Sequence, residues 1–316
     1  MYMESKLSCP SCEKNNLVDL QEVRSRDIEL LYKRNGIDTK KLFSNYPQVS
    51  LLHCLSCDLS FFSPAVTGDE DFYNQLQQKE WYFAHPDKTE FSYSKNFISD
   101  DYKVLDVGSG RGVLFSYIKD IKRVVYQGIE YSSKSIELAQ HDNVNVIKES
   151  VQDHAVRKPA YYDVVVTFQV LEHIDKIQEF VTACLACLKP GGKFIIAVPN
   201  NEGFLKYMMN NFLNLPPHHV NHWNETSLIN LGKLFNLKLI DVHKEKVTNV
   251  HKLLFYNIYI RNWFSKLFGM RYRLIDNSFL FRVTNKLIWW TSKIAIKFSK
   301  AHLKSDGHTI IIVFEK

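Results

Sequence analysis

One run of residues has the composition of a ligand-binding loop. Asp106 is followed by a glycine at every second position, namely Gly108, Gly110 and Gly112. Glycine lets the backbone turn sharply and approach a ligand where a Cβ atom would clash. The apolar residues at 104–105 predict a buried strand before the loop, and the helix expected after it has free N–H groups for an anionic group. The run therefore predicts a nucleotide-binding strand–loop–helix unit.

The glycine spacing distinguishes between kinds of nucleotide-binding loop. A dinucleotide-binding loop reads G-x-G-x-x-G, but Val113 occupies its third glycine position, and a phosphate-binding P-loop would end in Gly-Lys-Ser/Thr. The pattern D-x-G-x-G-x-G, with Ser109 between the first two glycines, resembles the first motif of class I S-adenosylmethionine (SAM)-dependent methyltransferases. An ordinary glycine turn of an α/β protein is the alternative interpretation.

A second acidic residue supports this resemblance. Residues 124–130 predict a second buried strand that ends at Glu130, 18 residues after Gly112. Ligands of open parallel sheets bind at the carboxyl ends of the strands. A carboxylate at that position can accept hydrogen bonds from both ribose hydroxyls, and Tyr131 could cover the adenine.

The remaining strands complete the expected sheet. Strand-like runs occur at 144–147, 162–168, 194–199, 237–242 and 308–314. The sequence Val-Leu-Glu-His at 170–173 follows the fourth strand, and Leu-Lys-Pro-Gly-Gly at 188–192 follows the next helix. Both also resemble this superfamily in order and spacing. The resemblance implies an α/β, Rossmann-like sheet of strand order 3-2-1-4-5-7-6, in which the last strand lies antiparallel beside the fifth.

The resemblance also implies which residues contact the cofactor. Asp106 and the loop backbone would hold the methionine end of SAM, and Glu130 would hold its ribose. The turn at Ser150 and Val151 would contact the adenine edge, and Gln169 would flank the methionine moiety.

Four cysteines occur in pairs that suit a metal site. Cys9 and Cys12 form one C-x-x-C pair, and Cys54 and Cys57 form another. Two such turns can supply four thiolates to one tetrahedral Zn²⁺ and leave no position open for catalysis, so we expect a structural, zinc-ribbon-like unit. Four unpaired structural cysteines are the alternative. The C-x-x-C pair at 184–187 lies within a periodic apolar helix, where core packing is the favoured interpretation.

Candidate catalytic bases occur in two places. His218, His219 and His222 follow two prolines in residues 215–223, which we call the histidine segment. This segment resembles one found in many methyltransferases from surface-polysaccharide and natural-product clusters. His173 follows Glu172 just after the fourth strand. Transfer of a methyl group to oxygen requires removal of the acceptor proton, and histidine titrates near neutrality. Loop histidines bonded to the backbone, or a divalent ion held by Glu172 and a histidine, are the alternatives.

Basic and aromatic residues concentrate before the last strand. Residues 244–304 contain 13 Lys or Arg and two acids, whereas the rest of the chain carries 27 basic and 32 acidic residues. The spacing predicts amphipathic helices with a cationic face. They could form a lid over the substrate, lie on an anionic membrane surface, or bind RNA. A nucleic acid is the least favoured of these partners.

These patterns divide the chain into four parts. We expect a zinc-ribbon-like unit at 1–65, a connecting helix or lid at 66–100, a SAM-binding domain at 101–243 plus 306–316, and a basic aromatic helical insert at 244–305. The connecting part has residues spaced for an amphipathic helix, which are Phe72, Tyr73, Leu76, Trp81, Tyr82 and Phe83. It resembles the lead-in helix of zinc-ribbon methyltransferases.

The chain lacks a signal-like opening segment and a run of 18 apolar residues. Its six cysteines, without such a segment, favour a reducing compartment. We therefore expect a cytoplasmic protein, peripheral at the inner membrane face if the basic insert binds lipid.

The whole pattern predicts a SAM-dependent methyltransferase that acts on a small molecule or glycan, with O-methylation of a sugar or polysaccharide intermediate as the favoured reaction. A ribosomal RNA base methyltransferase with a zinc ribbon is one alternative. Another common type of nucleic-acid methyltransferase is disfavoured, because its Asn/Asp-Pro-Pro-aromatic motif is replaced here by Thr-Phe-Gln-Val at 167–170. A non-catalytic SAM-binding interaction module is the remaining alternative. The sequence does not predict an oligomeric state.

Overall fold

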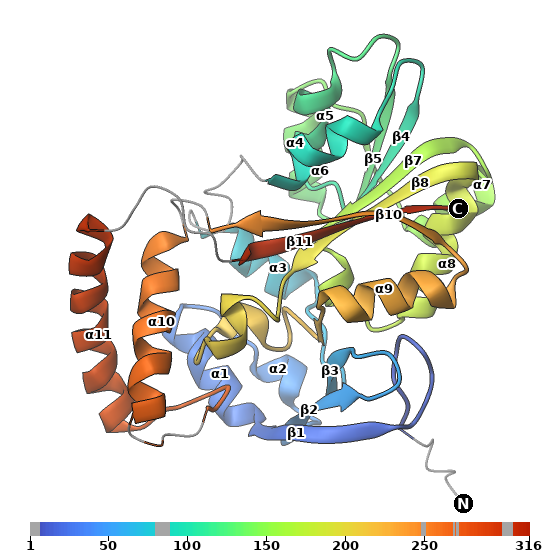
Figure 1. The fold of residues 1–316 in the computed structure, drawn as a ribbon. Helices are drawn as coiled ribbons and strands as arrows, with labels where there is room; N and C mark the ends of the chain where they lie inside the picture. Colours follow the sequence, from blue (N-terminus) through green and yellow to red (C-terminus); the bar gives the residue numbers. More distant parts are fainter. Residues whose placement is uncertain (1–6, 80–88, 248–250, 268, 270–271, 299–305) are drawn as a thin grey trace, which may run out of the picture.

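A computed structural model describes residues 7–79, 89–247, 251–267, 269, 272–298 and 306–316. Within these residues the chain forms a large central sheet flanked by helices, a smaller sheet below it, and a pair of helices at one side (Figure 1).

The central sheet has seven strands in the order β10-β11-β8-β7-β4-β5-β6. The strands are β4 (Lys103–Val107), β5 (Val125–Glu130), β6 (Val146–Lys148), β7 (Tyr162–Phe168), β8 (Leu188–Pro199), β10 (Lys238–Lys246) and β11 (Asp306–Glu315). Five strands are parallel, and β11 pairs antiparallel with both β8 and β10. The order 3-2-1-4-5-7-6 expected from the sequence is therefore confirmed.

Helices cover both faces of this sheet, because its central strands are apolar on both sides. They are α5 (Val113–Ile118), α6 (Ser133–His141), α7 (Val151–Arg157), α8 (Ile177–Cys187) and α9 (Glu225–Leu234). On β7, Val165 packs in one hydrophobic cluster, whereas Val164 and Val166 pack in the other, as the alternation of side chains along a strand requires.

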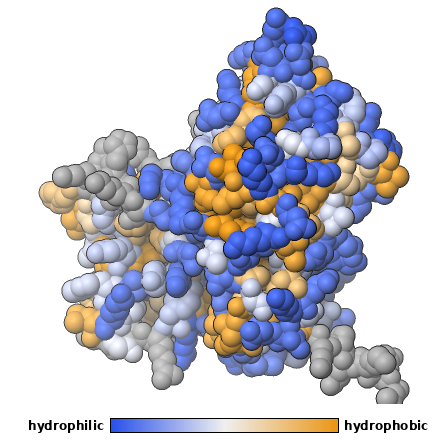
Figure 2. Space-filling model, turned by 45° about the vertical axis from the view of Figure 1, so that its right-hand side comes forward, coloured by the Kyte–Doolittle hydropathy of each residue, from blue (hydrophilic) through white to orange (hydrophobic). Residues whose placement is uncertain are grey.

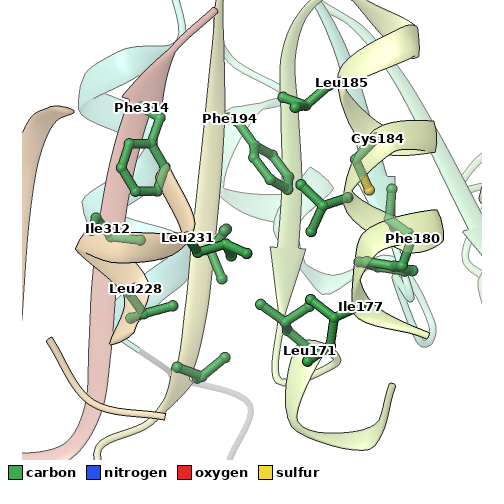
Figure 3. Close-up of a cluster of buried hydrophobic side chains, with 14 of the residues drawn as sticks. Leu171, Ile177, Phe180, Cys184, Leu185, Phe194, Leu228, Leu231, Ile312 and Phe314 are labelled. Carbon is green, nitrogen blue, oxygen red and sulfur yellow. The ribbon is translucent and has the colours of Figure 1, made fainter. Parts of the chain in front are cut away.

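The cluster on the α8 and α9 face contains Cys184. Figure 3 shows Cys184 among Phe180, Leu185 and Phe194, between α8 and the sheet. Cys184 and Cys187 are both fully buried. This C-x-x-C pair thus packs as part of the core, as the sequence predicted.

The smaller sheet joins two distant parts of the chain. Its order is β1-β2-β3-β9, with β1 (Leu17–Arg24), β2 (Gln48–Cys54) and β3 (Ser60–Ser63) from the N-terminal part and β9 (Asn221–His222) from the histidine segment. Helices α1 (Ser25–Arg34) and α2 (Lys40–Phe43) complete the N-terminal part. The histidine segment is therefore an edge strand of the N-terminal sheet, which the sequence did not predict.

The connecting segment is divided into short helices. They are α3 (Glu70–Gln77), α4 (Thr89–Ser94) and the 3₁₀ helix η2 (Lys95–Phe97). The Asp69 side chain caps α3 by accepting a hydrogen bond from the Phe72 N–H. The expected amphipathic helix has Phe72 and Leu76 buried on α3, whereas Trp81, Tyr82 and Phe83 lie outside the described residues.

The basic segment forms a helical hairpin. Helices α10 (Lys252–Leu267) and α11 (Phe279–Lys297) stand side by side at one edge of the molecule (Figure 1). Strand β10 continues to Lys246, so the insert leaves the sheet slightly later than the expected boundary at 244. Among the described residues, no helix is both long and apolar enough to cross a membrane.

Three short 3₁₀ helices lie in the loops at the carboxyl edge of the sheet. They are η3 (Leu171–His173), η4 (Phe204–Tyr207) and η5 (Phe212–Asn214). η3 directly follows β7, and η5 directly precedes the histidine segment.

Candidate active site

The glycine loop leaves space for a ligand at one position. Gly108, Gly110 and Gly112 have φ angles of 73°, 55° and 75°, in the left-handed region that favours glycine. A Cβ atom at Gly108 would lie 2.4 Å from a methyl group of Val170, and one at Gly112 would lie 2.5 Å from a methyl group of Val144. At Gly110 a Cβ atom would meet no atom within 4 Å. The outer glycines therefore permit close packing, and the central one borders open space.

The Glu130 carboxylate is held beside this space. Its Oε2 accepts a hydrogen bond from the Gly110 N–H at 2.9 Å, and its Oε1 accepts from the N–H groups of Tyr131 and Ser132 at 2.8 and 2.9 Å. Each carboxylate oxygen has two acceptor sites, so Oε2 keeps one site that can accept a hydrogen bond from a ribose hydroxyl. The Tyr131 side chain is 65% exposed and can cover a flat ring.

Asp106 lies buried at the base of the loop. It accepts a hydrogen bond from the Tyr126 hydroxyl at 2.9 Å. Burial raises the pKa of the Asp106 carboxyl to about 7, although the hydrogen bond from Tyr126 acts in the opposite direction. The sequence predicted Asp106 as a site residue and β4 and β5 as neighbours, but not the contact between the Tyr126 hydroxyl and this carboxylate.

Gln169 follows β7 with a strained backbone. Its φ angle is 57°, which is uncommon for a residue with a side chain. Its side-chain amide donates a hydrogen bond to Oε1 of Glu90 at 3.2 Å. Glu90 lies on α4 and is buried. The connecting segment thus supplies Glu90 as an acidic partner for Gln169 after β7. The sequence had not indicated that Glu90 is a site residue.

Ser150 and Val151 lie at the start of α7. Ser150 caps this helix by accepting a hydrogen bond from the Asp153 N–H at 3.0 Å. The preceding strand β6 pairs with β5 up to Glu130, which places the turn at the same edge of the sheet as the glycine loop. The Val151 side chain is buried in the core, so a ligand at this turn would contact its backbone.

Three of the four predicted histidines lie together. One ring nitrogen from each of His173, His218 and His219 lies within 4.8 Å of the others. Oε1 of Glu172 lies 3.9 Å from Nε2 of His173 and 4.0 Å from Nε2 of His219. We call Glu172 and these three histidines the histidine–glutamate cluster. The η3 helix supplies two of them, and the segment before β9 supplies the other two.

Hydrogen bonds fix the tautomers of His173 and His218. Nδ1 of His173 donates to the backbone carbonyl of His218. Nδ1 of His218 donates to the carbonyl of Leu213 at 2.9 Å. A carbonyl oxygen can only accept, so Nδ1 of each ring carries a proton, and in the neutral ring the lone pair is on Nε2.

His219 has the same tautomer. Its Nδ1 lies 2.9 Å from Oδ1 of Asn214, whose Nδ2 donates to Asn201 at 2.8 Å and thereby orients the amide. Burial lowers the pKa of His218 and His219 well below the usual histidine value, and the neighbouring histidines lower it further. Both rings are therefore neutral at physiological pH.

His222 lies outside the cluster. Its Nε2 donates a hydrogen bond to the Asn214 carbonyl at 2.8 Å, and its ring packs edge-on against Phe62. Burial lowers its pKa to about 4. The structure therefore separates His222, which supports the segment, from the three histidines that face one another.

The N-terminal part holds the histidine segment in place. The Tyr32 hydroxyl lies 3.0 Å from the Leu215 carbonyl and 2.7 Å from the Phe212 carbonyl. The Phe62 N–H donates to the Val220 carbonyl at 2.8 Å. These contacts join residues that are far apart in sequence, so no local pattern predicted them.

Helix α3 links the cluster to the glycine loop. The Tyr73 ring contacts the rings of His173 and His218. One turn later, the Gln77 amide exchanges hydrogen bonds with the Ser132 hydroxyl at 3.0 and 3.1 Å. Residues four apart in a helix are separated by about 6 Å along its axis. The cluster and the Glu130 region are therefore close neighbours on one helix face.

The four cysteines predicted as ligands also meet. Sγ of Cys9 lies 3.5 Å from Sγ of Cys57, and Sγ of Cys12 lies 3.5 Å from Sγ of Cys54. All four sulfur atoms lie within 4.8 Å of one another. Four thiolates bonded to Zn²⁺ at about 2.3 Å would lie roughly 3.8 Å apart, so the cluster has the size of such a site.

Comparison with known proteins agrees with the fold. Residues 74–242 match the family model of the methyltransferase domain, which is more than half of the chain. The chain therefore belongs to the methyltransferase domain family. Its sheet order is that of the class I, SAM-dependent members, and the space beside Gly110 and Glu130 fits SAM as the cofactor.

Curated relatives match the central part of the chain. The ubiquinone biosynthesis O-methyltransferase of Vibrio atlanticus is 32% identical over 112 residues, which are 34% of this chain and 46% of the relative. The protein of the same description from Klebsiella pneumoniae is 33% identical over 107 residues, 32% of this chain and 44% of the relative. The chain spans just under half the length of these relatives.

Solved structures of similar topology have low sequence identity. A SAM-dependent methyltransferase from Archaeoglobus fulgidus has a TM-score of 0.47 and 16% identity, over 72% of this chain and 92% of that protein. One from Thermotoga maritima has a TM-score of 0.48 and 15% identity, over 78% and 97%.

Proposed function

We propose that this protein transfers the methyl group of SAM to a hydroxyl oxygen of a small-molecule or glycan acceptor. The observation that carries this proposal is the position of the histidine–glutamate cluster. Val170 packs against Gly108 of the glycine loop, and Glu172 and His173 follow within three residues. Groups able to accept a proton thus adjoin the loop that would hold the cofactor.

The chain's own residues must place the acceptor and take its proton. When bound, SAM supplies a methyl group on a sulfonium, whose leaving group needs no further activation. The side chain of His173 is 17% exposed, whereas His218 and His219 are buried. His173 is therefore the imidazole that an acceptor hydroxyl would contact. The Glu172 carboxylate would stabilise positive charge that develops on the imidazoles. With SAM bound, the acceptor oxygen would bond to the methyl carbon, and the carbon–sulfur electron pair would leave with sulfur.

The cofactor contacts follow from the geometry of the loop. We assign the ribose to Glu130, the adenine to Tyr131 and the backbone of the Ser150 turn, and the methionine end to Asp106, the loop backbone and Gln169. Gly110 would face the bound molecule directly, since open space adjoins it.

We propose a sugar or glycan intermediate as the acceptor, on the resemblance of the histidine segment to that of surface-polysaccharide methyltransferases. A phenolic precursor of a quinone is the second candidate, favoured by the description of the curated relatives as ubiquinone biosynthesis O-methyltransferases. Both acceptors present a hydroxyl oxygen to the same cluster.

We also propose that the four N-terminal cysteines hold a structural zinc ion. The sulfur separations suit tetrahedral coordination, and four thiolates leave no position for a substrate. The N-terminal part would then act as a rigid support for the histidine segment, with which it shares a sheet.

The helical hairpin is proposed as a surface for an anionic membrane. An exposed apolar stripe runs along α11 through Phe279, Val283, Leu287, Trp290 and Ile294. The exposed cations Arg282, Lys286, Lys293 and Lys297 lie beside this stripe. Figure 2 shows hydrophobic residues exposed among hydrophilic ones on the helical hairpin, at the left of the view. Aromatic residues flanked by lysines suit the interface of a membrane with anionic headgroups.

Transfer from SAM with a labelled methyl group tests the proposed function. The protein is incubated with an extract of its native host, and the products are separated into glycan, lipid, small-molecule and RNA fractions. Label in a glycan or small-molecule fraction is expected. Label in RNA would favour the zinc-ribbon RNA methyltransferase instead. Unlabelled fractions, with SAM binding established by calorimetry, would favour a non-catalytic module.

A further inference from the structure

The histidine–glutamate cluster has the hydrogen-bond arrangement of a metal site. Histidines that bind metals donate their second ring N–H to a carbonyl or carboxylate, which fixes the tautomer. Here the Nδ1 atoms of His173, His218 and His219 all donate to carbonyl oxygens. Nε2 is therefore the nitrogen that each ring can offer to an ion.

The dimensions of the cluster agree with this interpretation. Three nitrogens bonded to one Zn²⁺ at about 2.1 Å lie roughly 3.4 Å apart. The cluster brings one nitrogen from each ring within 4.8 Å of the others, so a modest contraction would complete the site.

We propose that the histidine–glutamate cluster binds a divalent transition-metal ion through its three imidazoles, and that this ion receives the acceptor hydroxyl. Three histidine ligands leave a fourth position open, as in catalytic zinc sites. The site lies on the same face of α3 as the Glu130 region, because Tyr73 contacts the histidines and Gln77 contacts Ser132.

The inference rests on the proposed function and changes one role in it: with the three imidazole Nε2 atoms bonded to the ion, Glu172 rather than His173 takes the acceptor proton. Bonding to the ion lowers the pKa of the acceptor hydroxyl. The hydroxyl proton passes to the Glu172 carboxylate, whose Oε1 is about 4 Å from two of the imidazoles. The oxygen then forms a bond to the methyl carbon, the carbon–sulfur bond breaks, and its electron pair stays on sulfur. No oxidant or reductant takes part.

Substitutions can remove the ligand atoms while keeping the supporting hydrogen bonds. In His218→Asn and His219→Asn, the asparagine Nδ2 can replace Nδ1 as donor, but no atom replaces Nε2. The matched control is His222→Gln, whose Nε2 can still donate to Asn214. A further variant, Cys54→Ser, removes a ligand of the cysteine cluster only.

The experiment measures zinc per full-length chain by mass spectrometry, after incubation with Zn²⁺ and desalting. The wild type and His222→Gln should hold one ion at the cysteines and a second at the cluster, and each asparagine variant should lose the second. In the proteins loaded with Co²⁺, the difference spectrum of the wild type minus His218→Asn should show nitrogen and oxygen ligands without thiolate charge-transfer bands, whereas the difference of the wild type minus Cys54→Ser should contain those bands. Calorimetry with SAM confirms that each variant is folded.

The proposal is overturned if the wild type holds zinc only at the cysteines, or if both asparagine variants keep a full second equivalent. These outcomes differ from failure of the proposed function. A second ion in a protein that labels no acceptor would leave the metal site standing and remove methyl transfer. Labelling by a wild type that lacks the second ion would support methyl transfer and remove the metal site.

Discussion

At the scale of single residues, Glu130 determines where the cofactor binds. Its carboxylate is anchored by three backbone N–H groups, so it is oriented before any ligand arrives. Pre-orientation of this kind reduces the entropy lost on binding. Glu130 was also the residue most easily read from the sequence, because an acid ends a strand that follows the glycine motif.

We expect Glu130→Ala to lower SAM affinity by about 10- to 100-fold, because hydrogen bonds to a charged group contribute roughly 1.5–3 kcal/mol each. Isothermal titration calorimetry measures the change. The control is Glu137→Ala on the exposed face of α6, which should bind SAM like the wild type. Equal affinity of the Glu130 variant and the wild type would contradict the assignment of the ribose contact.

Asp106 should make stability depend on pH. Burial raises its pKa from 3.8 to about 7 in the folded protein, so the unfolded chain releases this proton first. Its contribution to the free energy of unfolding therefore falls as the pH rises from about 4 to above 7. Asp106→Asn removes this titration but can still accept the Tyr126 hydrogen bond.

Urea unfolding at pH 5 and pH 8 measures the effect. Relative to the wild type, the Asn variant should gain about 3 kcal/mol of stability between the two pH values, because the wild type loses about 1.4 kcal/mol for each of the roughly two pH units between pH 5 and the folded-state pKa of about 7. A difference between the proteins that does not change with pH would show that Asp106 titrates normally.

At the scale of elements, the hairpin of α10 and α11 stands apart from the glycine loop and presents an unusual surface. Apolar residues spaced three and four apart form a stripe on a helix, and on α11 this stripe faces solvent. A stripe packed against the protein would be buried, so the exposed stripe favours an external partner.

Leu287→Glu should weaken binding to vesicles that contain anionic phospholipid by 10-fold or more, since burial of a leucine side chain contributes about 1.5–3 kcal/mol. Flotation on a density gradient measures the bound fraction. Val156→Glu on α7 is the matched control, because Val156 is 82% exposed but lies on the central domain. Binding that is equal for neutral and anionic vesicles would argue against the electrostatic part of the proposal.

At the scale of the whole molecule, the N-terminal part and the histidine segment behave as one structure. β9 pairs with β3, and Tyr32 and Phe62 bond to carbonyls of the segment. The cysteine cluster and the core behind α8 also belong to the same hydrophobic cluster. A change at the cysteines should therefore reach the candidate active site through packed structure.

Cys54→Ser should increase hydrogen exchange at the amides of 218–222 by 10-fold or more, because opening of the small sheet then requires less free energy. SAM affinity should stay within about twofold, since the glycine loop belongs to the other sheet. Hydrogen exchange with mass spectrometry and calorimetry measure the two effects. Unchanged protection of 218–222 would show that the cysteine cluster does not support the segment.

The sequence by itself determined the parts of this protein that depend on local pattern. Alternating and continuous apolar runs predicted the strands, and the spacing of Gly108, Gly110 and Gly112 predicted the loop, because backbone geometry limits which residues can occupy such turns. The paired cysteines likewise indicated one cluster, since two C-x-x-C turns can converge on one ion.

Only the tertiary structure decided how the chemistry is assembled. It joined His173 to His218 and His219, excluded His222, and brought Glu90 to Gln169. It also made the histidine segment a strand of the N-terminal sheet. Such contacts join residues that lie tens to hundreds of positions apart, and they depend on the packing of whole elements. No periodicity or local motif specifies that packing, which is why the sequence named the histidines but could not show which of them act together.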